Sequence, residues 1–303
     1  MNTHLYTFYD LPYGHDVCHL FEHILLDNFM AILKENGYER ATFGWLDGET
    51  VGSSLFFNLC TYDTQSLALF ESTLSNPLEI DEAVIQRCLR HISAEMKARI
   101  TVTDMELLKE QLRDISAHMQ SKTAPHTTEI DSPLRITPAK GSFKGIAIIL
   151  DLTDADTDLK KSFLFFRDSI LDIVKDALPQ DIAMYATATS PFDAHLNHLM
   201  TAQRYTVSKD VSIDELQASI ENRIRTYAHK EINSIRLTPF LDAFKERAWL
   251  NGAIANFYKN TGIQTTHDEL VHLASAETLQ AILQKLTVKV LPVKGRLKHI
   301  WGE

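Results

Sequence analysis

The stretch "GHDVCHLFEHILLDNF", Gly14 to Phe29, places histidines and acidic residues in an apolar run, and within it His19-x-x-Glu22-His23 forms an H-x-x-E-H pattern. If the stretch is helical, His19 and His23 share one face, because residues four apart lie one turn apart. Two imidazoles on one face can hold a zinc ion. Glu22 then projects beside the ion without having to bind it, as a carboxylate must if it is to take a proton from a zinc-bound water.

This motif has two readings. In the first, a third protein ligand, commonly a carboxylate, arrives from elsewhere in the chain, because two histidines leave zinc incompletely coordinated. In the second, the histidines lie at the polar rim of an ordinary helix and Glu22 is solvated. The chain has 13 histidines, and such a match arises by chance in roughly one sequence of this kind in thirty. The motif alone therefore does not decide between the readings.

Length and composition limit the class of protein. A chain of 303 residues with 45% hydrophobic residues can bury a substantial core, and its length suits two modest domains. The formal net charge of -10 argues against nucleic acid as a partner, since Lys and Arg must neutralise the phosphates. We expect a globular protein that does not bind nucleic acid.

The compartment is also an expectation from sequence. The N-terminal residues lack the features of a signal peptide, and no apolar run reaches the roughly 20 residues that a membrane span needs. Three cysteines, Cys18, Cys60 and Cys88, cannot form a closed set of disulfides and show no C-x-x-C spacing. We expect a cytoplasmic location without a membrane partner, and buried thiols.

The first half of the chain alternates strand and helix patterns. A strand is expected at Leu5–Tyr9, and Gly37 is expected to end the motif helix. Residues 40–59 are rich in Thr, aromatic and branched residues around Asp47-Gly48, a pattern typical of a hairpin with its turn there. Further helices are expected over residues 16–35 (the motif helix), 63–75, 81–100 and 101–119.

The second half repeats this plan after a proline-containing stretch at 121–142 that we interpret as a linker. We therefore predict domains at 1–120 and 143–303. In the second, Ser212 begins a capping-box pattern before a helix. Its other expected elements are strands at 143–150, 182–189, 203–207 and 286–293 and helices at 156–177 and 238–256. Strand, helix, strands and more helices in each half indicate a duplicated α+β unit.

The motif and its surroundings resemble the M16 metallopeptidases, the family of pitrilysin, insulin-degrading enzyme and the mitochondrial processing peptidase. The family motif reads like G-x-x-H-F-x-E-H-M, and here it is "VCHLFEHIL", with the glycine earlier, at Gly14. This inverzincin-type order is the reverse of H-E-x-x-H. The resemblance implies two related domains, each a mostly antiparallel sheet covered by helices on one face. It also implies a zinc-dependent endopeptidase with Glu22 as general base.

The third zinc ligand implied by the resemblance is Glu95. It lies in the helix pattern "DEAVIQRCLRHISAEMKARI", at the spacing of about 70 to 80 residues after the motif that is usual for this family. Glu82 is a rival that stands near the helix start and fits the pattern less well. His15 and His91 are expected to be neighbours of the site or surface residues rather than ligands.

Substrate contacts are also implied. The edge strand near Thr42, Phe43, Gly44 and Trp45 is expected to hold an extended peptide backbone to backbone. Tyr185 matches the tyrosine of an R-x-x-x-x-x-x-Y pattern that family members use to bind substrate.

Three departures from the family keep other functions open. The chain is short for a two-domain member, Cys88 stands where a second glutamate is common, and Leu178 occupies the arginine position of the R-x-x-x-x-x-x-Y pattern. One alternative is a weak or inactive subunit that needs a partner chain, as a homodimer or a heterodimer with another M16-like chain, to complete the chamber. The other is a non-enzymatic peptide-binding protein.

Overall fold

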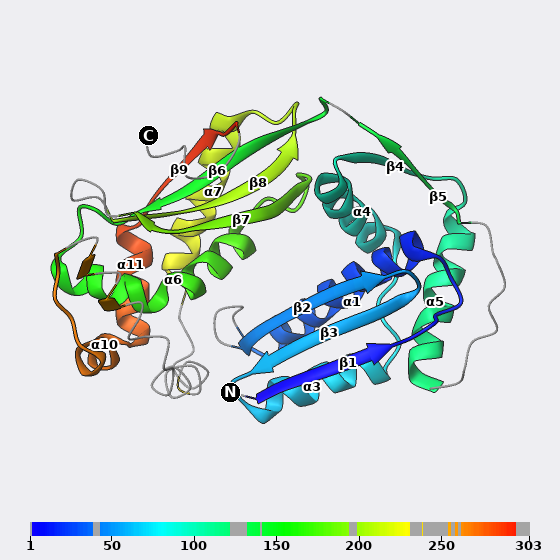
Figure 1. The fold of residues 1–303 in the computed structure, drawn as a ribbon, viewed down its shortest axis with the longest axis horizontal. Coiled ribbons are helices and arrows are strands. Elements are labelled where there is room, and N and C mark those ends of the chain that lie inside the picture. The colour runs from blue at the N-terminus through cyan, green and yellow to red at the C-terminus, as the bar shows by residue number, and fades with distance from the viewer. Residues whose placement is uncertain are drawn as a thin grey trace. The chain divides into compact units, whose positions relative to one another are not determined.

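The fold was analysed in a computed structural model that describes residues 2–38, 43–121, 132–139, 141–193, 199–230 and 262–294, together with residues 238, 254–255 and 258–259. The chain divides into two compact units, Met1–Lys140 and Gly141–Glu303. Each unit combines antiparallel sheet with helices (Figure 1). The α+β class expected from the sequence is therefore confirmed.

The main sheet of the first unit has three antiparallel strands in the order β1-β3-β2. These are β1 (Asn2–Phe8), β2 (Gly44–Val51) and β3 (Ser54–Thr61). On β3, alternate side chains point into the core, among them Leu55, Phe57 and Leu59, because successive residues of a strand face opposite sides. Helices α1 and α3 cover this face (Figure 1).

The hairpin turn lies elsewhere than the sequence suggested. Asp47 and Gly48 are paired with Asn58 and Phe57 in the middle of β2, so the turn predicted there is wrong. The chain reverses instead between Val51 and Ser54, through Gly52 in the left-handed conformation (φ 62°). A local Asp-Gly signal was overridden by the longer register of the two strands.

Four helices are described in full in the first unit. They are α1 (His15–Glu35), α3 (Thr64–Ser75), α4 (Glu82–Met96) and α5 (Met105–Ser121). Asp63 caps α3 by accepting a hydrogen bond from Ser66 N, and Asp81 caps α4 in the same way from Val84 N. Such caps satisfy backbone donors that have no partner within the helix.

Helix α4 ends earlier than predicted. Lys97 takes the left-handed conformation (φ 51°), and the chain continues as β4 (Ala98–Val102), which pairs with β5 (Leu134–Pro138). The extension of the helix to Ile100 is therefore wrong. Strand β5 falls within the stretch interpreted as a linker and belongs to the first unit.

The second unit contains a four-stranded antiparallel sheet in the order β7-β8-β6-β9. Its helices α6 (Thr157–Ala177), α7 (Ile213–Ala228) and α11 (Ala276–Lys285) lie on one side of that sheet (Figure 1), and α10 (His267–Leu273) contacts α6. The strands are β6 (Phe143–Asp151), β7 (Met184–Asp193), β8 (Met200–Ser208) and β9 (Thr287–Pro292).

Two further expectations concern single segments. The helix expected at 238–256 falls almost entirely outside the described residues. Within the described part of the chain, no helix has the length and apolarity needed to cross a membrane.

Candidate metal centre

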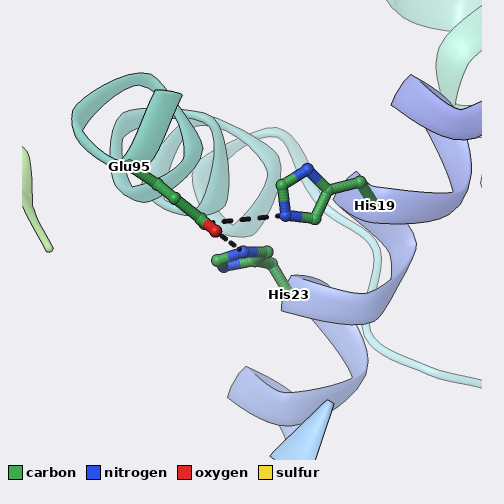
Figure 2. A group of neighbouring side chains, drawn as sticks. All are labelled: His19, His23 and Glu95. Carbon is green, nitrogen blue, oxygen red and sulfur yellow. Dashed lines mark ion pairs between the residues drawn. The ribbon is translucent and has the colours of Figure 1, made fainter. Parts of the chain in front are cut away.

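Helix α1 supplies two imidazoles at the edge of the core. Its apolar positions recur at helical spacing, so Leu20, Phe21 and Ile24 are buried in the core of the first unit. This packing leaves His19 and His23 on a neighbouring face, with side chains only 13% and 14% exposed. Glu95, in the last turn of α4, points toward both of them (Figure 2).

The three donor atoms converge. Glu95 Oε2 lies 3.3 Å from His23 Nε2 and 3.6 Å from His19 Nε2, and the donor atoms of the three residues all lie within 4.8 Å of one another. Among the described residues, no other group of three or more His, Cys, Asp or Glu side chains is arranged in this way.

These distances fit a zinc ion. Tetrahedral ligands about 2.0 to 2.1 Å from zinc are roughly 3.3 to 3.4 Å from each other, close to the two separations from Glu95 Oε2. That oxygen is also buried and, despite the two nearby imidazoles, accepts no hydrogen bond of good geometry. Because a buried carboxylate oxygen without a donor is costly, the donor set fits a bound cation.

Charges and burial shift the pKa values of Glu95 and His19. Burial raises the pKa of Glu95, but the hydrogen-bonding and charge contributions of His19 and His23 outweigh it and bring the pKa down to about 2. Burial lowers the pKa of His19, and Glu95 more than reverses this, so the net shift is upward. Glu95 is therefore anionic, and a proton would compete with any metal for His19.

Glu22 is held against strand β2, away from water. Its side chain is 5% exposed, and Thr50 donates a hydrogen bond from Oγ1 to Glu22 Oε2. A Cβ at Gly48 would lie 2.8 Å from Glu22 Oε1, so the missing side chain at Gly48 makes room for the carboxylate. Burial raises the pKa of Glu22, although Thr50 and the neighbouring histidines pull it down. A raised pKa is typical of a carboxylate that accepts and returns a proton.

The residues that hold Glu22 were not found from the sequence. Gly48 was assigned to a turn and Thr50 was not singled out. Only the register of β2 against β3 puts both on the side of the sheet that faces α1. The usable signal was the alternation along β2, on which Trp45, Asp47 and Glu49 face solvent.

The neighbouring residues weighed as ligands lie outside the donor set. Glu82 is the first residue of α4 and is exposed, at the opposite end of that helix from Glu95. The exposed His15 stacks on His19 with ring centroids 5.6 Å apart. His91 is partly buried, and burial, together with the nearby His23, lowers its pKa to about 4.

The strand expected to bind a peptide, residues 42–45, lies only partly within the described residues. Thr42 lies outside the described residues. Phe43 is buried in the core and packs edge-on against Phe29, so only its backbone is left for the expected contact with a peptide. Gly44 and Trp45 begin β2, and Trp45 is 47% exposed. Gly44 has φ 130°, and a Cβ there would lie 1.9 Å from the Cys60 carbonyl oxygen, so only glycine fits this entry to the strand.

The two positions of the R-x-x-x-x-x-x-Y comparison lie in the second unit. Tyr185 is on β7, the edge strand of that sheet. Leu178 is the residue that ends α6, and its carbonyl accepts a hydrogen bond from Arg223 Nη1 at 2.8 Å. As the sequence shows, no arginine occupies this position.

Comparisons with known proteins add little at the sequence level. No model of a known protein family matches the chain, and no curated protein sequence does so. Solved structures that align include a protease from Helicobacter pylori, with 11% identity, TM-score 0.30 and coverage of 92% of this chain and 89% of that one. A protein described as an M16-like peptidase, from Alicyclobacillus acidocaldarius, aligns with 11% identity, TM-score 0.26 and coverage of 95% and 89%.

An insulinase-family protease from Yersinia pestis aligns with 11% identity, TM-score 0.29 and coverage of 92% and 83%. Overlaps at these TM-scores carry no argument about activity. The reasoning about function therefore starts from the site itself.

Proposed function

We propose that this chain is a zinc-dependent endopeptidase that cleaves unfolded peptides. The observation that carries the proposal is the convergence of His19 Nε2, His23 Nε2 and Glu95 Oε2 beside a buried carboxylate, Glu22. Two histidines and one glutamate are a ligand set typical of catalytic zinc sites, in which the fourth position is left open for water or substrate.

Each residue has a distinct role in the proposed reaction. His19, His23 and Glu95 would hold zinc, which when bound supplies Lewis-acid activation of a water molecule. Glu22 accepts the proton that this water loses and later delivers it to the leaving amine. Thr50 fixes one carboxylate oxygen of Glu22, so the other oxygen is available for the proton.

The substrate class follows from the position of β2. This strand pairs with β3 and, among the described strands, with no other. An unpaired edge can accept an extended peptide through backbone hydrogen bonds, which favours unfolded chains over folded proteins. Gly44 and Trp45 lie at the start of this edge, and Tyr185 is kept as a proposed substrate contact.

A second candidate is a weak subunit that gains full activity with a partner chain, either a second copy or another M16-like protein. Leu178 favours it, because a leucine cannot supply the positive charge that would stabilise the developing oxyanion. Sizing the purified protein while measuring its activity separates the two, since full activity of a lone monomer contradicts the subunit reading.

The decisive variant is Glu22→Gln, measured on an unstructured peptide with zinc content determined in parallel. Cleavage should fall by about 10²- to 10⁴-fold, the usual contribution of a general base, while one zinc per chain is retained. Glu49→Gln is the matched control, because Glu49 lies on the same strand with its side chain exposed to solvent, and it should cleave normally. Undiminished cleavage by the Glu22→Gln protein would contradict the mechanism.

A further inference from the structure

A partly buried ion pair joins the two helices that carry His19, His23 and Glu95. Arg87 of α4 donates from Nε to Asp27 Oδ1 of α1 at 3.0 Å, and from Nη2 to Asp27 Oδ2. Such a bidentate contact fixes the relative orientation of the two side chains as well as the distance between them. The two side chains are only 25% and 27% exposed, so water screens this pair less than it screens a surface ion pair.

The pair lies farther along the same two helices. Asp27 follows His23 by four residues, about one turn of α1, and Arg87 precedes Glu95 by eight residues, about two turns of α4. His19 and His23, in the first half of α1, lie near Glu95 at the end of α4. Asp27, farther along α1, contacts Arg87 in the first half of α4, so the two helices run antiparallel. At 1.5 Å per residue, Arg87 lies about 12 Å along α4 from Glu95.

Glu95 depends on this kind of support. It is the residue before Met96, where α4 ends, and Lys97 then turns into the left-handed conformation. The carbonyls of a last helical turn lack partners within the helix, so the position of Glu95 is set largely by how the rest of α4 is held.

A second contact holds the chain just before α4. The backbone N–H of Glu79 donates to Asn28 Oδ1 at 2.8 Å, and Asn28 Nδ2 donates to the Glu79 carbonyl at 3.1 Å. The start of α4 is thereby fixed to α1 independently of Arg87. Beyond that point Ile85, Leu89 and Ile92 of α4 pack in the core. The contact between Arg87 and Asp27 adds a directional polar link between the two helices.

We propose that Asp27 and Arg87 are a positioning pair that places Glu95 at zinc-binding distance from His19 and His23. The inference rests on the proposed zinc site and adds residues that act on it through α4. A zinc–oxygen bond tolerates only a few tenths of an ångström around about 2.0 to 2.2 Å. A small slide of α4 therefore costs metal affinity without unfolding the domain.

The test measures zinc affinity of the full-length, metal-free protein by competition with a coloured chelator, and the visible spectrum after cobalt loading. Arg87→Met and Asp27→Asn should each weaken zinc binding on the order of 10-fold, as loss of residues that orient metal ligands does, and should change the cobalt spectrum. The double variant should lose no more than either single variant, because the two residues act as a unit.

Tyr13→Phe is the matched control. It removes a hydrogen bond of 2.9 Å from the segment before α1 to Asp114 of α5, and so weakens the attachment of α1 without touching α4. Its zinc affinity should equal that of the wild type. If Arg87→Met fails to fold, the isosteric Asp27→Asn protein provides the same test.

The outcomes separate this inference from the proposed function. Zinc affinities of Arg87→Met and Asp27→Asn within twofold of the wild type would overturn the positioning role, as would an equal loss in Tyr13→Phe. If either occurs while Glu95→Gln still weakens zinc binding on the order of 100-fold, the zinc site stands and only this inference fails. A wild-type protein that takes up no zinc would overturn both.

Discussion

The two units begin in the same way and differ in chemistry. Each opens with a strand followed by a 21-residue helix, α1 in the first unit and α6 in the second. Helix α1 carries two imidazoles and a buried carboxylate, whereas α6 has no histidine in its sequence and buries Phe163 and Phe166. Helix α6 is amphipathic, with Lys, Arg and Asp at its outward positions, so the comparison teaches that a helix in this place packs without histidines or a buried carboxylate. We infer that the polar face of α1 is present for chemistry and not for folding.

Deleting core volume from α6 should give the largest effect, and the effect should be confined to stability. Phe163 is fully buried, so Phe163→Ala should lower the free energy of unfolding by about 3 to 5 kcal/mol, as measured by denaturant titration. Zinc affinity of the folded protein should not change, because every proposed ligand lies in the first unit. A loss of zinc binding would contradict the claim that the first unit binds the metal and that α6 serves only packing.

The next prediction concerns the cluster of His19, His23 and Glu95 in the first unit. Zinc sites with four ligands are worth about 10 to 16 kcal/mol, or roughly 3 kcal/mol per ligand, so Glu95→Gln should weaken zinc binding on the order of 100-fold. Competition with a chelator measures this. Glu82→Gln, at the other end of the same helix, is the control and should bind zinc as the wild type does.

Proton competition should give a smaller effect. Burial alone lowers the pKa of His19, and Glu95 raises it beyond its ordinary value of 6.5. The proton must leave before zinc binds, so affinity is full above this raised pKa and falls by up to about 10-fold per pH unit below it. NMR titration of the metal-free protein should find the pKa of His19 above 6.5, and Glu95→Gln should lower it. An unchanged pKa in that variant would contradict the coupling.

The smallest change concerns the hydrogen bond to Glu22. Thr50→Val keeps the shape of the side chain but removes the donor, so kcat should fall about fivefold, equivalent to ~1 kcal/mol, with zinc still bound. Thr50→Ser retains the hydroxyl and should be nearly normal. Equal activities of the two variants would show that the hydrogen bond does not orient the base.

The sequence predicted the parts that depend on local periodicity. Helix α1 was expected because its apolar residues repeat at helical spacing, whereas Glu95 was expected from the resemblance to the M16 metallopeptidases. The end of α4 was missed because Lys97 adopts a conformation usually left to glycine. The contact of Gly48 and Thr50 with Glu22 was missed because it depends on strand register, and the pairing of Asp27 with Arg87 because it joins residues distant in sequence.

The most direct test of the central claim is anomalous diffraction at the zinc edge from crystals of the zinc-loaded protein. The account predicts one strong peak in the first unit, about 2.0 to 2.2 Å from His19 Nε2, His23 Nε2 and a carboxylate oxygen of Glu95. A zinc-loaded crystal with no peak at these three residues, or with its peak elsewhere, would contradict it.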